Sequence, residues 1–337
     1  MNRSKNLNCG RFALSICIAA AMLAGCRGSQ PPIGEAGVMP QNRAIATQAK
    51  RGGSWMLPEA RSGALLYVAD SSGYLYVFTY PNGKLVGQVS ADAAGGLCSD
   101  KAGNVFVTDF RGEKVVEYAH GGTKPIATLL VNGEPWDCSV DPVTGNLATV
   151  NSDTDGAGSV AIFTNATGKG TTYTDSGAAF GSTCSYDNAG NLFVSAGFGG
   201  SRFLLAELPY GDSTFRNITV NGDFRGGNFI QWDGSYVAVT NANPKQSVVV
   251  SQVEVSGSTA NVVGTTTVRG SYGYVKYFWI QGNRIITPLN GGGPRARKVG
   301  LWRYPAGGNA SKVITIPKGT NSPGIALGIT ASVAPSR

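Results

Sequence analysis

A short run of β-forming residues recurs along this chain at intervals of 39 to 49 residues, and this repeat restricts the fold more than any other feature. A period of this length is typical of β-propeller blades, each of which is a four-stranded antiparallel sheet. The sequence therefore predicts an all-β, six-bladed β-propeller with four antiparallel strands per blade. The six runs begin at Leu66, Val105, Leu147, Leu192, Tyr236 and Ile285.

Three of these runs follow a turn that starts with Asp and ends in Gly-Asn. Both Gly and Asn tolerate positive φ, so the pair closes a tight hairpin between two strands. Because the aspartates recur once per repeat, we interpret them as structural residues. The three turns are Asp100–Asn104, Asp141–Asn146 and Asp187–Asn191.

The two ends of the repeat predict how the ring closes. The first unit starts at its second strand at Leu65, while an extra apolar segment, Ser322–Leu327, follows the last unit. A C-terminal inner strand added to the first blade would complete that blade and leave no open sheet edge. An open solenoid is the alternative.

The second unit also carries a family resemblance. The segment Gly96–Asp109, Gly-Leu-Cys-Ser-Asp-Lys-Ala-Gly-Asn-Val-Phe-Val-Thr-Asp, resembles the repeat of NHL-repeat and gluconolactonase-like propellers. The third and fourth units match moderately, and the fifth and sixth match loosely. The resemblance extends over residues 61–332 and implies the propeller fold. It implies little about chemistry, since propellers carry unrelated functions.

The N-terminus has the features of a bacterial lipoprotein. Cationic residues precede a short apolar segment, Phe12–Leu23, which is followed by Ala24, Gly25 and Cys26. The sequence Leu-Ala-Gly-Cys resembles the lipobox, which implies that residues 1–25 are a signal peptide and that Cys26 is lipidated. An ordinary secretory signal with a chance Cys is the alternative.

The expected location follows from this anchor. We expect residues 26–60 to form a flexible tether rich in Gly and Pro, and residues 333–337 to form a short tail. The lipid anchor would hold the protein in the bacterial cell envelope. Arg27 stands where Asp commonly retains lipoproteins at the inner membrane, so the outer membrane is favoured in a diderm cell.

Charge is distributed unevenly along the chain. Residues 255–337 contain ten Lys and Arg and no acidic residue, whereas residues 61–254 contain 11 basic and 18 acidic residues. This basic sector is either an ordinary solvated surface or a contact for an anionic envelope component. A protein partner is also compatible with it. We expect a monomer that binds no nucleic acid.

Three cysteines remain outside the N-terminal segment, and each falls on a predicted inner strand. Cys138 and Cys184 have matching neighbours, which makes a disulfide between them one interpretation. Three thiols cannot all pair within one chain, so buried free thiols including Cys98 are the favoured interpretation. A metal site with three thiols is the third.

Signatures of catalysis are weak in this sequence. His120 is the single histidine and lies in a turn before an outer strand, and no nucleophile elbow, P-loop or zinc spacing occurs. The gluconolactonase-like resemblance implies a divalent metal such as calcium in the channel. Oxygen ligands could come from Asp109, Glu134, Asn151 and Asn241, although none matches a family motif. We therefore assign no metal ligand and expect no cofactor.

One face of the predicted propeller is a candidate for ligand binding. Loops that join blades, and loops between second and third strands, should emerge together there. Aromatic side chains beside arginines on this rim would suit a sugar or an anionic ligand, with ordinary loop composition as the alternative. The candidate residues are Trp136, Phe180, Phe224, Arg225, Arg269, Tyr272, Arg295 and Arg297.

These observations favour a lipid-anchored envelope propeller that binds or scaffolds a ligand the sequence does not identify. A metal-dependent lactonase, hydrolase or lyase of the gluconolactonase-like type is the alternative function.

Overall fold

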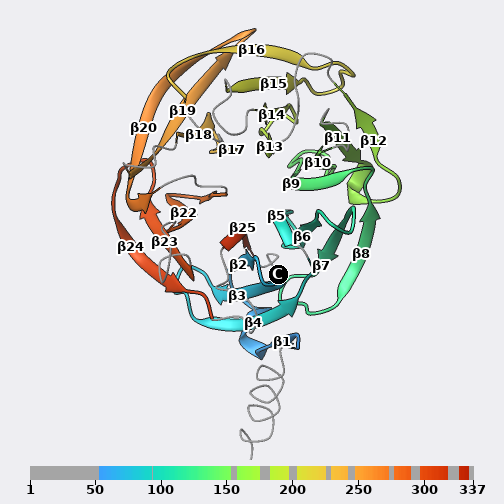
Figure 1. Ribbon diagram of the computed structural model, residues 1–337, viewed down its shortest axis with the longest axis vertical. Coiled ribbons are helices and arrows are strands. Elements are labelled where there is room, and N and C mark those ends of the chain that lie inside the picture. The colour runs from blue at the N-terminus through green and yellow to red at the C-terminus, as the bar shows by residue number, and fades with distance from the viewer. Residues whose placement is uncertain are drawn as a thin grey trace, which may run out of the picture. The chain divides into compact units, whose positions relative to one another are not determined.

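The computed structural model is an all-β protein, as the repeat predicts. It describes residues 53–92, 94–152, 158–174, 183–196, 203–224, 229–241, 247–272, 277–289, 297–317 and 326–333. The strands form antiparallel meanders that surround a common axis, which is the arrangement of a β-propeller (Figure 1). None of the helices in these ranges has the length and apolar character needed to cross a membrane.

The first two meanders come from the N-terminal third of the chain. The first contains β2 (Leu65–Asp70), β3 (Tyr74–Thr79) and β4 (Leu85–Ser90), with β1 (Trp55–Met56) outside β4 and β25 (Ala326–Ser332) inside β2. The second contains β5 (Ala94–Ser99), β6 (Val105–Asp109), β7 (Lys114–Tyr118) and β8 (Pro125–Leu130).

The next two meanders have the same order from the axis outward. One contains β9 (Glu134–Val140), β10 (Leu147–Ser152), β11 (Ser159–Phe163) and β12 (Thr171–Tyr173). The other contains β13 (Thr183–Tyr186), β14 (Leu192–Ala196), β15 (Leu204–Leu208) and β16 (Arg216–Asn221). Two short 3-10 helices, η1 (Pro58–Arg61) and η2 (Thr164–Ala166), precede β2 and follow β11.

The remaining strands continue the ring. One meander contains β17 (Ile230–Trp232), β18 (Val237–Asn241), β19 (Ser247–Ser256) and β20 (Thr259–Tyr272), and the other contains β21 (Trp279–Gln281), β22 (Arg284–Pro288), β23 (Lys298–Arg303) and β24 (Gly307–Thr315). The outer strands β16, β20 and β24 pair in parallel and join three meanders into one 12-stranded sheet. Because these sheets merge, the count of six separate blades stays a prediction.

The predicted closure by a C-terminal strand is confirmed. β25 pairs antiparallel with β2, from Leu65 opposite Ser332 to Asp70 opposite Ala326. Within the described residues this strand contains the last two residues of the predicted segment Ser322–Leu327 and continues to Ser332. Residues 322–325 lie outside the described residues.

An apolar cluster fixes this closure from both sides. Leu66 of β2 and Phe78 of β3 pack with Ile286 of β22, Leu301 of β23 and Ile329 of β25, and all five are buried. Comparable clusters lie between the other neighbouring meanders. The core is therefore a ring of interfaces between meanders, which makes the first and last meanders as interdependent as any other pair.

The boundary of the predicted tether is too late by a few residues. Trp55 and Met56 form β1 opposite Gln88 and Gly87 at the outer edge of β4. Gly87 has no side chain, and a Cβ there would clash with the Met56 sulfur, so its absence lets β1 approach. The propeller thus includes residues from Trp55 onward, while residues 1–52 lie outside the described part of the chain.

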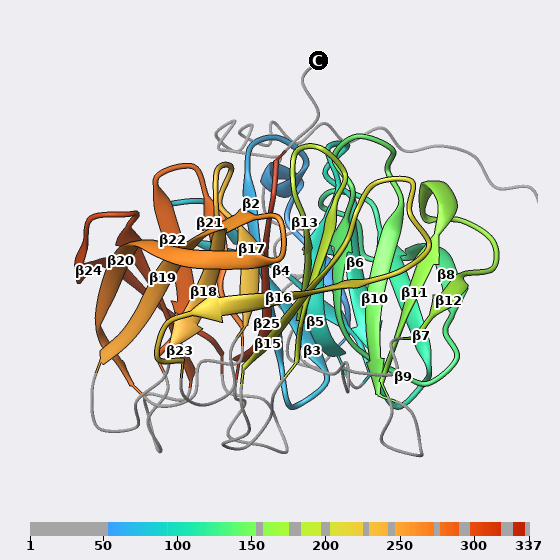
Figure 2. The same cartoon turned by 90° about the horizontal axis from the view of Figure 1, so that it is seen from above.

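The Asp–Gly-Asn turns have the structural role that the sequence predicts. Asp100 Oδ1 accepts the Asn104 N–H at 2.7 Å, and Asp187 Oδ1 accepts the Asn191 N–H at 2.9 Å. Gly103 has φ of +84°, which is the left-handed region that favours Gly. These turns lie at one end of the propeller, which we call the hairpin face; the opposite end is the loop face (Figure 2).

Candidate binding channel

The inner strands enclose a cavity on the axis of the propeller. Strands β5, β9, β13, β17, β21 and β25 lie around this axis (Figure 1), and residues from all six line a cavity of about 150 Å³. Its lining combines polar residues, among them Asp137 and Gln231, with the aromatic residues Tyr186, Tyr277 and Phe278. A small concave site with a few convergent polar groups is the ordinary form of a ligand pocket.

Side chains on the inner strands bond to the backbone of the next inner strand, and we call these contacts inner-strand bridges. In each of three bridges a side-chain oxygen of one inner strand accepts a backbone N–H of the next. The residue that supplies this oxygen stands two positions before the Asp that begins the hairpin turn after its own strand. The bridges join Ser139 to Tyr186, Ser185 to Trp232 and Gln231 to Ile280, at 3.0, 2.7 and 2.6 Å.

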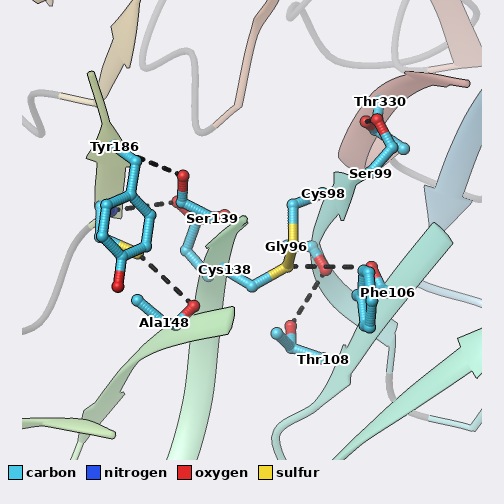
Figure 3. The surroundings of a disulfide bond; sticks show 12 residues. Gly96, Cys98, Ser99, Phe106, Thr108, Cys138, Ser139, Ala148, Tyr186 and Thr330 are labelled. Atoms are coloured by element: carbon cyan, nitrogen blue, oxygen red, sulfur yellow. Dashed lines mark hydrogen bonds between the residues drawn. A yellow bond between two sulfur atoms is a disulfide. The ribbon is translucent and has the colours of Figure 1, made fainter. Parts of the chain in front are cut away.

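The same position on β5 carries a cysteine. Cys98 stands two residues before Asp100, and its sulfur forms a disulfide with Cys138 of β9 (Figure 3). The Cys98–Cys138 bond therefore takes the place of a hydrogen-bonded inner-strand bridge between β5 and β9. Closing a loop of 40 residues by a covalent link stabilises a fold by about 2–4 kcal/mol.

This disulfide corrects the predicted state of two cysteines. The favoured interpretation left Cys98 and Cys138 as free thiols, and the alternative paired Cys138 with Cys184. Matching of neighbouring residues made Cys138 and Cys184 look equivalent, and both do stand three residues before their turn Asp. Side chains at equivalent positions of adjacent inner strands point in the same direction around the ring, so they do not face each other. The disulfide therefore joins non-equivalent positions, Cys98 and Cys138.

Cys184 remains a free, buried thiol, as predicted. Burial, and then the negative charge of nearby Asp137, raise the pKa of this thiol well above its usual value. A thiol with a raised pKa is a poor nucleophile at neutral pH. Cys184 is therefore a packing residue in the apolar cluster that includes Ala148 and Val194.

Replacement of Ser139 by Cys is expected to create a second disulfide. Ser139 and Cys184 have the same relative positions on β9 and β13 as Cys98 and Cys138 have on β5 and β9. Alkylation of the unfolded Ser139→Cys protein, read by mass spectrometry, should find neither the introduced thiol nor Cys184 modified. The matched variant Ser185→Cys has Ile230 as its facing residue and should keep both its introduced thiol and Cys184 free. Two alkylated thiols in Ser139→Cys would contradict the positional equivalence.

Asp137 is the one carboxyl group in the wall of the cavity among the described residues. Its side chain is 7% exposed, and its Oδ2 accepts the Cys184 N–H at 3.3 Å. Burial raises the pKa of Asp137 to about 8, although the N–H groups of Cys138 and Cys184 act in the opposite direction. A strongly raised pKa in a pocket marks a candidate functional residue.

A bond across the channel narrows its loop-face end. The Tyr277 hydroxyl, just before β21, donates to the Trp136 carbonyl of β9 at 2.9 Å, although β13 and β17 separate these strands around the ring. The Tyr277 ring lies 5.2 Å from the Phe229 ring. Burial and the nearby Asp137 raise the Tyr277 pKa above its usual value, so its hydroxyl keeps its proton.

The hairpin face is hollowed above the cavity. A hollow of about 700 Å³ lies between the β5–β6 and β9–β10 turns, and it shares Ser99, Val140, Pro142 and Trp279 with the cavity below. Val143 at its rim is 56% exposed. We call the hollow and the cavity together the funnel. The hollow opens on the face opposite to the predicted ligand face, and Asp137 lines the adjoining cavity.

The predicted ligand-face residues do not form one group in the described part of the chain. The Trp136 ring stacks on Phe110 at 5.1 Å, and Phe224 packs on Phe203 at 5.0 Å, so both rings are engaged within the fold. Tyr272 ends the outer strand β20. Three further candidates lie outside the described residues: Phe180, Arg225 and Arg295.

Two of the predicted basic residues are far apart along one strand. Arg269 of β20 lies opposite Asn309 near the start of β24, whereas the Arg297 carbonyl accepts the Ile316 N–H just beyond its end. Asn309 and Ile316 are seven residues apart. At about 3.3 Å per residue, they are separated by roughly 20 Å along the strand. Arg269 and Arg297 therefore do not meet, in contrast to the expectation that their loops would converge.

Two of the four predicted oxygen ligands, Asp109 and Asn241, make contacts within the fold, whereas the buried Oδ1 of Asn151 has no hydrogen-bond partner among the described residues. Asp109 accepts the Gly112 N–H at 2.9 Å and pairs with Lys114 at 3.3 Å, and the Asn241 amide donates to the Asp223 carbonyl at 2.6 Å. The described ranges contain no cluster of three or more His, Cys, Asp or Glu side chains that could hold a metal ion.

His120 contributes to ring closure. Its Nε2 lies 3.0 Å from the Gly63 carbonyl and its Nδ1 lies 2.6 Å from the Ser332 hydroxyl of β25. Burial shifts the pKa of His120 below its usual value, although the bond to the Gly63 carbonyl acts in the opposite direction. The neutral imidazole thus links the segment before β2 to the closing strand.

Comparisons with known proteins identify the fold and no family. No protein-family model and no curated protein sequence matches the chain. The propeller in the crystal structure of a nidogen/laminin complex is similar, with a TM-score of 0.62 and 14% identity over 81% of this chain and 100% of that chain. Kuenenia stuttgartiensis hydrazine synthase is similar with a TM-score of 0.50 and 13% identity over 74% of this chain and 76% of that one. These similarities establish a β-propeller.

Proposed function

We propose that this chain is a lipid-anchored binding module of the bacterial cell envelope, and that it binds its ligand in the funnel. The observation that carries this proposal is the cavity that holds the buried carboxyl of Asp137 and shares four lining residues with the hollow on the hairpin face. A protein core gains nothing from a buried acid that has no cationic partner, so its presence in a cavity beside an open hollow favours binding. The similar propeller from a nidogen/laminin complex supports protein partnering by this fold.

The rim of the hollow supports a role in partner binding as well. Val143 and Val333 are 56% and 49% exposed, and both border the hollow together with Pro142. Exposed apolar side chains around a concavity are typical of interaction sites. The basic sector of residues 255–337 would add a weak, salt-dependent attraction to an anionic envelope component.

The test of binding is a charge placed at the rim of the hollow. Val143→Lys should abolish capture of envelope components by the intact anchored protein, because a desolvated ammonium group would oppose contact there. Val313→Lys is the matched control, since Val313 of the outer strand β24 is also exposed, at 44%. Capture is measured by crosslinking and mass spectrometry against wild type. Equal capture by all three proteins would exclude the funnel as the site.

The anchor is proposed on the lipobox-like sequence that ends at Cys26. Cys26→Ser should give an uncleaved precursor that incorporates no labelled fatty acid, because the thiol that receives the lipid is absent. The measurement is metabolic labelling followed by N-terminal analysis, with Cys17→Ser as the matched control. Undiminished labelling of Cys26→Ser would contradict the anchor and leave the binding proposal intact.

A further inference from the structure

The chemistry of the cavity indicates a class of ligand, provided that the funnel is the binding site as proposed above. We propose that the cavity binds the head group of a small organic cation, an amine or quaternary ammonium, with the Asp137 carboxylate as its counterion. Aromatic rings would form the walls around the cation. The argument has four parts: the missing counterion, the aromatic lining, the charge of the entrance and the size of the space.

Asp137 lacks a cationic partner. The described residues that line the cavity include no Lys, Arg or His. A carboxylate in such a place is costly until a positive charge joins it, because burial reduces its hydration and the described lining residues include no counterion. A cationic ligand would supply that charge and would let Asp137 ionise.

The walls of the cavity suit an organic cation. Tyr186, Phe229, Tyr277 and Phe278 are all nearly buried and all line the space, together with Trp279. The Tyr277 ring is held in place by its bond to Trp136 and by its contact with Phe229. Aromatic faces attract cations, and this attraction is strongest in desolvated sites.

The entrance of the funnel carries the matching charge. The described charged residues that line the hollow are two acids, Asp100 and Asp141, and one base, Lys101, so their net charge is negative. Negative charge at the mouth of a concave site raises the local concentration of cations. The cavity of about 150 Å³ then limits the guest to a small head group.

Ligand binding would be coupled to release of a proton. Other titratable groups around Asp137 keep their protons, since the pKa of Cys184 on β13 and that of Tyr277 before β21 are both raised. The disulfide of β5 and β9 does not titrate. Ionisation of Asp137 alone then governs affinity, which should fall about tenfold for each pH unit below the Asp137 pKa.

The experiment is calorimetric titration of the full mature protein with choline and with 3,3-dimethylbutan-1-ol, its uncharged carbon analogue. At pH 8 we expect choline to bind at least about tenfold more tightly than the alcohol. The choline affinity should fall about tenfold from pH 7 to pH 6. Asp137→Asn, with its fold checked by circular dichroism, should lose most of the preference for choline over the alcohol and the pH dependence of choline binding.

Several results would overturn the ligand class. These are equal affinity of wild type for choline and the alcohol, no binding of choline, or a choline affinity that does not change with pH. An equal response to potassium chloride at the same concentration would also overturn it, since the rings would then be irrelevant. If Val143→Lys abolished capture of envelope components while choline failed to bind the wild type, the ligand class would fall and the binding function would stand.

Discussion

A chain that ends at Thr320 is expected to lose the cooperative unfolding of the entire ring. Removal of β25 would expose the inner edge of β2, and it would take Ile329 out of the cluster between the first and last meanders. It would also remove Ser332, whose hydroxyl contacts the Gly103 carbonyl and His120. Because every interface in a closed ring depends on the next, the loss should spread through the fold.

The measurement is thermal unfolding followed by calorimetry and circular dichroism. The shortened chain should melt lower by on the order of 10 °C or more, or show no transition. A chain that ends at Val333 keeps β25 and is the matched control, which should melt like the full protein. Identical melting of the Thr320 chain and the control would show that β25 does not close the ring.

Asp137→Asn is expected to raise stability at pH 8 and to remove a pH dependence. The folded pKa of Asp137 is about 8, against a usual value of 3.8, so the folded protein binds more protons than the unfolded chain between these two values. The free energy of unfolding should therefore fall as pH rises through this window, by up to about 1.4 kcal/mol per pH unit. Asparagine does not ionise, so the variant should lose this slope.

Asp233→Asn is the matched control with the opposite sign. Burial alone would raise the Asp233 pKa, but hydrogen bonds from Tyr304 and Gln252 outweigh it and hold the pKa below its usual value. The charged form of Asp233 thus stabilises the fold above the unfolded pKa, and this variant should lose stability at neutral pH. Chemical denaturation of both variants from pH 5 to pH 8 is the measurement. If the free energy of unfolding had the same slope against pH in wild type and in Asp137→Asn, Asp137 would not be a buried, protonated acid.

The repeat was sufficient to predict the fold because its signals are local. Asp100, Gly103 and Asn104 close a turn through contacts among themselves, so their spacing alone indicates the strands on either side. Closure was also predictable, since the first unit lacked one strand and the C-terminus offered one. The exact residues of β25 depend on its register with β2, which a single apolar run does not specify.

The candidate site was less predictable because it depends on contacts between repeats. Counting back from each turn Asp would have placed Cys98 with Ser139, and thus facing Cys138. The same alignment places Asp137 at the position that Thr183 has on β13. An acid at a position that carries an uncharged residue in the next repeat is the signal that indicates Asp137. The choice of face could not come from loop composition, since rings such as Trp136 and Phe224 pack against their own neighbours.

The central claim is that this propeller binds through its funnel, and hydrogen exchange tests it most directly. Exchange is measured by mass spectrometry on the mature anchored protein, with and without solubilised envelope extract. The account predicts slower exchange at the hairpin-face turns Asp100–Asn104 and Asp141–Asn146, which border the hollow. Slower exchange confined to the loop-face segments, such as Phe110–Glu113 and Arg297, or no change at either face, would contradict it.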